Sequence, residues 1–218
     1  MVVAGLAREH ILPRWHSSAW VRCRWLFVLA LAFPAVSYAA PAPRPAILYH
    51  VAPGFVTLRF VVRSMLDLFT VTGDFKHFSG DLLLDFDAPA HSHVDVTVAS
   101  ASIDTGWDTA NKIVRSAAYL DPARYPTVHF VSDRIVELAP DHVTLHGQLT
   151  VRGVTRPEEL DARLEDYRNE PGVGPVADFV VTGQFNRGDF GLTADYPLVS
   201  MQVSLQINAH IRLTPVKP

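Results

Sequence analysis

Strict alternation of apolar and polar residues is the clearest pattern in this chain. Over residues 199–213, apolar side chains occupy every odd position and polar side chains every even position. Because successive side chains of a strand point to opposite faces, this pattern predicts a long strand with one apolar and one polar face. At about 3.3 Å per residue the strand would extend about 50 Å, so we expect it to be bent.

Shorter segments repeat the same pattern along the chain, and strands are therefore predicted at 56–62, 93–98, 142–149, Gly80–Asp87, Pro126–Ser132 and Asp178–Asn186. Helical spacing of apolar residues supports a helix at Asp108–Ala118, with Asp and Thr as capping candidates. Pro157–Tyr167 fits either a helix or a strand with a loop. We expect one all-β antiparallel domain with one or two short helices. Alternation alone leaves a sandwich and a barrel equally open.

The N-terminal segment has the three parts of a secretory signal peptide. Four arginines precede the apolar run Trp25–Phe33, and Ser37-Tyr38-Ala39 supplies small residues at the cleavage positions. The apolar run is too short to span a bilayer, which takes about 20 residues. We therefore predict a signal peptide over residues 1–39, a Pro/Ala tether over 40–46 and a folded domain over 47–214. A membrane anchor or a buried helix is the alternative for residues 1–39.

Composition narrows the function classes. The net charge of −3 argues against nucleic-acid binding, which usually requires a basic excess. The single cysteine, Cys23, excludes a disulfide framework and a multi-cysteine metal site. It also lies within the predicted signal peptide, so the remaining domain must be stabilised by its core without disulfides.

Catalytic and metal-binding signatures are absent from the sequence. There is no G-x-S-x-G or H-E-x-x-H motif and no glycine-rich phosphate loop after a strand. The pairs His91/His93 and His142/His146 would each share a strand face. We expect them to be solvated on the outer face, so neither metal nor cofactor is predicted. Asp104 and Asp108 flank a turn and a helix start, where capping is expected rather than acid–base catalysis.

Several short motifs are more specific, although each one alone is a turn or corner. Arg187 or Arg152 could satisfy a carboxylate at a barrel end. In chain order the motifs are Tyr49-x-Val51-x-Pro53, Gly73-x-Phe75-x-x-Phe78-x-Gly80, Ala101–Gly106, Arg115-Ser116, Tyr119–Asp121, Tyr125–Phe130, Gly147–Pro157 and Asn186–Gly191.

Taken together and in this order, these motifs resemble the YceI-like family of bacterial periplasmic polyisoprenoid-binding proteins. The resemblance runs from about Tyr49 to Leu213. It implies a lipocalin-like, eight-stranded antiparallel β-barrel with an apolar tunnel that holds a long isoprenoid or related lipid tail. The family often has histidines where this chain has Phe55 and Ser64, and Met65–Thr72 is one residue longer than usual. This region is expected at the tunnel mouth, where the departures affect contacts to a lipid head group.

The resemblance therefore implies a periplasmic carrier or sequestering protein, and not an enzyme, for a polyprenyl chain, a prenyl quinone or a similar amphipathic lipid. Transient membrane contact and a homodimer are compatible with this role, and no nucleic-acid partner is expected. For each candidate lining residue, packing in a filled core is an equally good interpretation. The candidates are Val56, Leu58, Phe60, Phe75, Leu84, Phe86, Val96, Val98, Phe130, Phe179, Val181, Phe185, Met201, Val203 and Leu205.

Two alternatives come from other function classes. The first is an enzyme that acts on a lipid or quinone head group, with Asp104, Arg187 and Asp189 as its polar set. No base–nucleophile pair is visible to support it. The second is a solid barrel that serves only in stress or in protein interaction.

Overall fold

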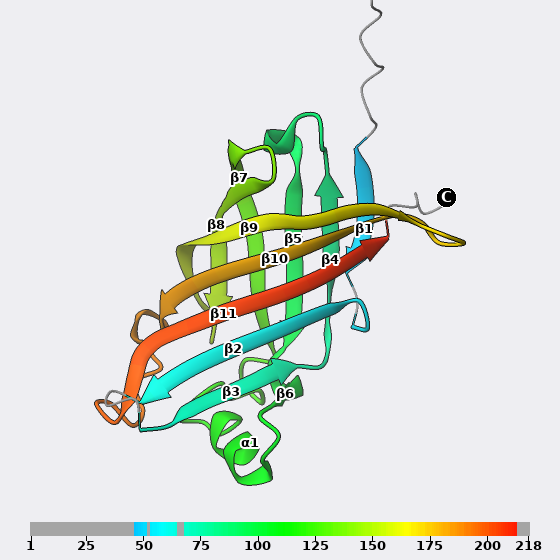
Figure 1. Cartoon of the computed structure of the whole chain (residues 1–218). Coiled ribbons are helices and arrows are strands. Elements are labelled where there is room, and N and C mark those ends of the chain that lie inside the picture. The colour runs from blue at the N-terminus through cyan, green and yellow to red at the C-terminus, as the bar shows by residue number, and fades with distance from the viewer. Residues whose placement is uncertain (1–45, 52, 65–67, 213–218) are drawn as a thin grey trace, which may run out of the picture. The chain divides into compact units, whose positions relative to one another are not determined.

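The computed structural model describes residues 46–51, 53–64 and 68–212 of the chain (Figure 1). The predicted signal peptide, residues 40–45 of the tether and residues 213–214 of the predicted domain lie outside the described residues. The described part is built almost entirely of β-strands. In chain order the elements are β1 (Ile47–Val51), β2 (Val56–Ser64), β3 (Thr70–Phe75), β4 (Phe78–Leu84), η1 (Pro89–His91), β5 (His93–Ala99), η2 (Ser100–Ser102), β6 (Ile103–Asp104), α1 (Asp108–Val114), β7 (Thr127–Ala139), β8 (His142–Val151), β9 (Val154–Glu170), β10 (Gly174–Asn186), η3 (Arg187–Phe190) and β11 (Val199–Arg212).

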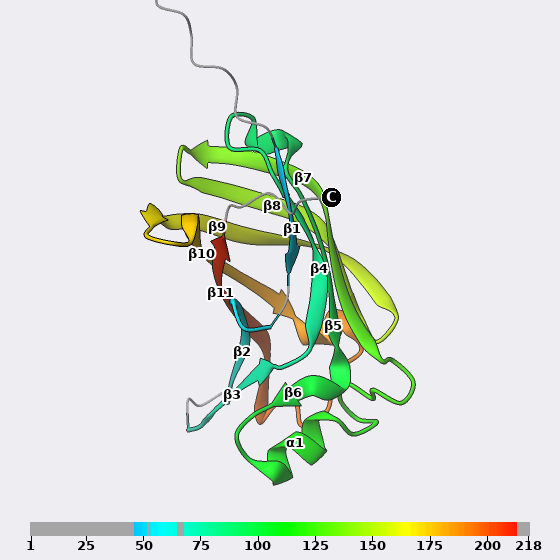
Figure 2. The same cartoon turned by 90° about the vertical axis from the view of Figure 1, so that its right-hand side faces the viewer.

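All strands of the described ranges belong to one curled antiparallel sheet with the order β1-β4-β5-β7-β8-β9-β10-β11-β2-β3-β6. The predicted all-β, lipocalin-like architecture is confirmed, but the sheet has 11 strands where eight were expected. Its edge strands β1 and β6 are short and are not neighbours, so the sheet forms a half-barrel (Figure 2).

The sheet divides at the corner between β3 and β4. β3 pairs with β6, whereas β4 pairs with β5. Two backbone hydrogen bonds hold this corner, from Lys76 N to Ser102 O (3.1 Å) and from Ala99 N to His77 O (2.9 Å). One continuous segment, β5–η2–β6, therefore connects the two diverging parts of the sheet at the end where α1 lies (Figure 2).

The long strands follow the alternation in the sequence. β11 covers the predicted strand and is bent near its start, where its register with β2 shifts between Val199 and Val203 (Figure 1). Pro157–Tyr167 lies within β9, because β8 and β10 pair with it on either side. The turn between β8 and β9 places Arg152 and Gly153 at φ of 51° and 73°, a backbone conformation typical of tight two-residue hairpins.

The predicted helix is shorter than its apolar spacing suggested. α1 ends at Val114 rather than Ala118, because the chain turns back through hydrogen bonds from Ser116 N to Ile113 O and from Leu120 N to Val114 O. Its N-cap is Trp107, which makes no side-chain capping bond, so the prediction of an Asp or Thr cap was wrong. Asp104 instead holds the preceding turn, where its Oδ1 accepts from Gly106 N (3.0 Å).

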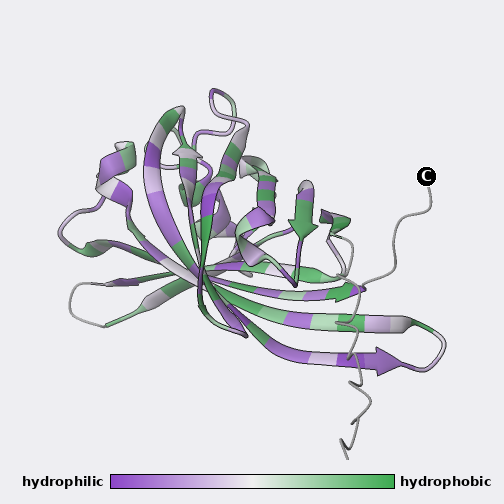
Figure 3. Cartoon of the chain, turned by 90° about the horizontal axis from the view of Figure 1, so that it is seen from above, coloured by the Kyte–Doolittle hydropathy of each residue, from purple (hydrophilic) through white to green (hydrophobic). Residues whose placement is uncertain are grey.

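The apolar residues of the alternating strands gather on the concave side of the sheet. Figure 3 shows the apolar and polar bands that follow one another along the long strands. Buried clusters form around Phe130 and Leu149, around Leu58 and Val98, and around Phe60. No helix within the described ranges is both long and apolar enough to cross a membrane.

Candidate functional site

The concave side of the sheet encloses a cavity of about 560 Å³. All of the described strands contribute residues to its walls, and α1 lies at one end. The lining is dominated by apolar side chains at alternate strand positions, such as Leu58 and Phe60 on β2 or Val203 and Leu205 on β11. The period-two pattern therefore produces an apolar interior that side chains do not completely fill.

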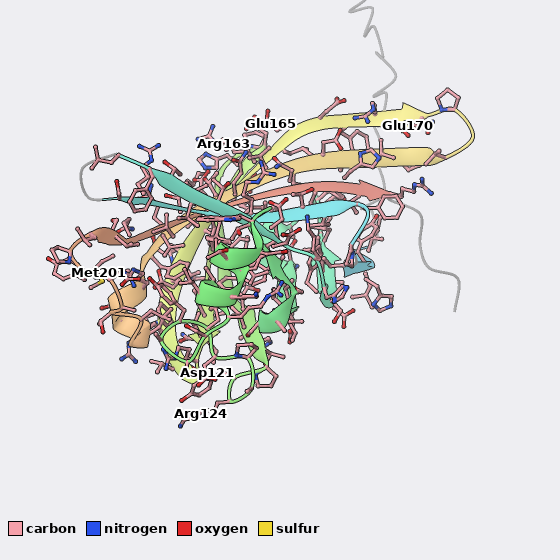
Figure 4. All side chains as sticks on the ribbon, turned by 90° about the horizontal axis from the view of Figure 1, so that it is seen from below. Asp121, Arg124, Arg163, Glu165, Glu170 and Met201 are labelled. Carbon is pink, nitrogen blue, oxygen red and sulfur yellow. The ribbon has the colours of Figure 1, made fainter. Side chains whose placement is uncertain are left out.

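All of the candidate lining residues except Met201 lie in the wall of this cavity. Contact of these side chains with a ligand stays a prediction. Met201 lies outside the cavity lining. It falls in the stretch where the register between β11 and β2 shifts, so it leaves the alternation that Val199 and Val203 keep. A Cβ at Gly188 would lie 3.5 Å from its Sδ, which places Met201 against η3 (Figure 4).

Glycines on neighbouring strands make room for two of the largest lining side chains. A Cβ at Gly73 would lie 2.4 Å from the ring of Phe60, its partner across β2 and β3. A Cβ at Gly147 would lie 2.7 Å from the ring of Phe130. Any larger residue would displace these rings. The glycines therefore let each ring lie over the neighbouring strand, which leaves space in the middle of the cavity.

The candidate set missed the residues that close one end of the cavity. Trp107, Ala110, Ile113 and Val114 come from α1 and the residue before it, and Phe69 comes from the connection between β2 and β3. These positions do not follow strand alternation, so a search for period-two patterns passes over them. A usable signal was the helical spacing of Ala110, Ile113 and Val114 in a chain with very little helix.

Arg187 is the most deeply buried charged side chain that lines the cavity, with 3% of its surface exposed. Its guanidinium donates to four backbone carbonyls in the connection from η3 into β11: Leu192 O (2.6 Å), Ala194 O (2.8 Å), Val199 O (3.0 Å) and Ser200 O (2.8 Å). The prediction that Arg187 or Arg152 pairs with a carboxylate was wrong. Arg187 fixes a loop, and Arg152 lies over the Tyr125 ring at 5.5 Å.

Tyr119 fixes the same loop from the other side. Its hydroxyl donates to Asp195, and its ring lies 6.0 Å from the Arg187 guanidinium carbon. Burial, and then the bond to Asp195, raise the pKa of Tyr119 to about 12, so the phenol stays neutral over the physiological range. Arg187 and Tyr119 together hold residues 192–199 in place at the α1 end.

Glu158 is an acidic side chain within the largely apolar lining of the cavity. It is half-buried and lies on the inward face of β9, two positions before Leu160. Burial, followed by the nearby charge of Asp189, raises the pKa of the Glu158 carboxyl above its ordinary range.

The three polar residues that the enzyme hypothesis requires do not form one site. Among the described residues, no hydrogen bond or ion pair joins Asp104, Arg187 and Asp189 to one another. The Asp104 carboxylate accepts hydrogen bonds from Gly106 N and from Asn111 Nδ2 (3.1 Å). These two hydrogen bonds lower its pKa.

The four histidines of the two predicted pairs each lie close to a neighbouring side chain, and His142 also lines the cavity. His146 lies 2.9 Å from Glu159, His142 bonds to Asp161, and His93 Nδ1 lies 3.2 Å from Ser132 Oγ. His142 retains 16% exposure of its side chain, so it is more enclosed than the solvated position expected. In the part of the chain that the structure describes, no group of three or more His, Cys, Asp or Glu side chains is arranged to hold a metal ion.

The two ends of the cavity are lined differently. At the α1 end, Phe69, Trp107 and Ile113 line the cavity and are also 49%, 65% and 47% exposed. At the opposite end, around η1 and the β7–β8 hairpin, the lining includes Asp85, Ser92, Asp141 and His142. There, Ser92 Oγ accepts from Asp85 N (2.9 Å), and Asp85 Oδ1 accepts from Ala88 N (2.8 Å).

Comparison with known proteins agrees with this architecture. Protein YceI of Escherichia coli O6:H1 is 35% identical over 136 residues, which cover 62% of this chain and 71% of that protein. Protein YceI of Salmonella arizonae gives the same identity and coverage. Among solved structures, BcnA of Burkholderia cenocepacia is similar with a TM-score of 0.64 at 21% identity, covering 72% of this chain and 96% of that one.

A polyisoprenoid binding domain from Saccharophagus degradans, implicated in plant cell wall breakdown, is also similar. Its TM-score is 0.53 at 16% identity, and the match covers 78% of this chain and all of that one (100%). The sequence model of the YceI-like domain family matches residues 49–211, which is nearly the whole described part of the chain. With these motifs, this sheet and this match, the chain belongs to the YceI-like family.

Proposed function

We propose that this protein binds the apolar chain of an isoprenoid or similar amphipathic lipid in its cavity, and carries or sequesters that lipid. The observation that carries the proposal is the cavity of about 560 Å³ with a mainly apolar lining. This volume lies in the range of small-molecule sites, roughly 300–1,000 Å³. A ligand in this cavity would meet strand side chains over most of its length.

Physical chemistry favours a lipid tail over a polar ligand. Each CH₂ group moved from water into such a cavity contributes about 0.8 kcal/mol, so a long tail binds tightly without specific polar contacts. Arg187, the buried cation of the lining, already donates to backbone carbonyls and so offers little to a polar substrate. The similar domain from Saccharophagus degradans is described as polyisoprenoid binding, which supports an isoprenoid as the ligand class.

The proposal includes export and a non-catalytic role. The arginines, the apolar run Trp25–Phe33 and Ser37-Tyr38-Ala39 support a cleaved signal peptide and a periplasmic location. Asp104 and Arg187 are each engaged in local structural bonds, which supports binding without catalysis.

The proposal is tested by filling the cavity from one wall. Leu205→Trp adds bulk to the inward face of β11, and we expect a folded protein that no longer retains lipid. The measurement is mass spectrometry of an organic extract of the purified protein, followed by uptake of geranylgeraniol from solution. Wild type should yield a stoichiometric lipid or take up the prenol.

Gln206→Trp is the matched control, because Gln206 follows Leu205 on the same strand and is exposed on the opposite face. It should bind as wild type does. Equal lipid occupancy in both tryptophan variants would contradict binding in the cavity. A wild-type protein that is empty and takes up no prenol would favour a role in stress or protein interaction.

A further inference from the structure

An exposed apolar rim surrounds the α1 end of the cavity. It consists of Leu68, Phe69, Trp107, Ile113 and Leu198, whose exposed fractions are 78%, 49%, 65%, 47% and 73%. Single exposed apolar residues are ordinary on protein surfaces. These five come from three segments far apart in the sequence, which the fold gathers at one end of the domain (Figures 1 and 2).

Hydrogen bonds hold two of the three segments side by side. Val199, next to Leu198, pairs with Ser64 at the end of β2. The buried hydroxyl of Ser64 accepts from Leu68 N (2.7 Å) and Phe69 N (3.2 Å). α1 is joined to this arrangement through Val114, which packs with Val62 and Val71 around Phe60.

The rim is continuous with the cavity. Phe69, Trp107 and Ile113 each line the cavity while about half or more of their own surface faces solvent. An apolar chain that passes between these side chains would keep apolar contact from the outside of the domain to its interior. The rim therefore has the composition and position of a mouth for a lipid.

We propose that this rim docks onto the surface of a lipid bilayer, so that the lipid of the proposed function passes between bilayer and cavity without crossing water. The inference rests on the proposed function and identifies the surface that serves it. The rim side chains stand on two connections and a short helix, a shape that can enter the head-group region. Tryptophan is enriched at this level of a bilayer. A tightly fitted protein partner, including a second copy of this chain, would cover the mouth and block exchange.

Trp107 provides a reporter within the rim. The chain has four tryptophans, and the other three, Trp15, Trp20 and Trp25, all lie in the predicted signal peptide. In a full chain with phenylalanine at those three positions, all tryptophan emission comes from Trp107. With vesicles of brominated phosphatidylcholine, we expect this emission to shift to shorter wavelength and to be quenched.

The matched control moves the reporter to the other end of the domain. Leu138 lies near the end of β7, is 58% exposed and does not line the cavity. In the same background, Trp107→Phe with Leu138→Trp should show neither shift nor quenching. The N-terminal segment is identical in both proteins, so its own affinity for vesicles cannot produce the difference. Leu68→Ser with Leu198→Ser should weaken the quenching of Trp107, whereas Leu138→Ser should leave it unchanged.

The outcomes separate this inference from the proposed function. Uptake of geranylgeraniol in the absence of vesicles, with no quenching of Trp107, would overturn the docking surface and leave the carrier intact. Equal quenching of the two reporters would also overturn it. Quenching of Trp107 without prenol uptake would overturn the carrier. Dimerisation of the wild type that Leu68→Ser with Leu198→Ser abolishes, without any quenching, would assign the rim to a second copy of the chain.

Discussion

The two ends of the cavity belong to the same sheet but present different chemistry to solvent. At the α1 end, apolar side chains such as Trp107 and Phe69 are both lining and exposed. At the η1 end, Asp85 and Ser92 bind nearby backbone groups, and the exposed Leu138 stays outside the lining. Strand alternation therefore produces the apolar interior, whereas the connections between strands decide which end carries exposed apolar side chains.

The largest expected effect comes from Arg187, which supports the α1 end. Arg187→Met would leave four backbone carbonyls of residues 192–200 without their charged donor. We expect a loss of about 3 kcal/mol or more in the free energy of unfolding, because buried acceptors would be left unpaired. Urea denaturation measures it. Arg152→Met, which removes a half-buried cation from the Tyr125 ring, should cost about 1 kcal/mol or less. Equal losses would show that the burial of Arg187 is not the source of its effect.

A substitution at Ser64 tests whether its hydrogen bonds hold the rim in place. Ser64→Ala removes the acceptor for Leu68 N and Phe69 N at a site with 5% exposure, so we expect a loss of about 1–3 kcal/mol. Because the rim loop would loosen, this variant should also weaken the vesicle quenching of Trp107. Asp85→Ala is the counterpart at the η1 end, where it removes the acceptor for Asp87 N and Ala88 N. It should leave the quenching unchanged, and an equal loss of quenching in both variants would contradict the assigned roles of the two ends.

Replacing Glu158 gives the smallest effect on stability, and the size of that effect depends on pH. Its carboxyl has a folded pKa above the ordinary value of 4.5, since burial disfavours the charged form. The stability that the neutral carboxyl allows is fully present below pH 4.5 and is lost as pH rises through the folded pKa. Glu158→Gln does not titrate, so it should be more stable than wild type at pH 7 and equal to it near pH 4. Glu165→Gln, at an exposed position of the same strand outside the cavity lining, is the control. A pH-independent difference for Glu158→Gln would show that ionisation is not involved.

Strand positions were predictable because a strand with one buried face imposes period two on the sequence. β11, β5 and β10 fall where alternation placed them, and most of the candidate residues line the cavity for that reason. Alternation could not reveal that Met201 leaves the pattern, because the register shift near Val199 is set by pairing with β2. It also left Pro157–Tyr167 open, since the choice of strand came from the flanking strands β8 and β10.

The sequence by itself determined the apolar interior, the scarcity of helix and, through its ordered motifs, the family. Tertiary structure decided what local patterns do not encode: that the sheet stays a half-barrel, that Arg187 binds carbonyls instead of a carboxylate, and that the rim residues meet at one end. The physical reason is range. Alternation records which face of each strand is buried, whereas closure, loop anchoring and the rim depend on contacts between residues distant in the chain.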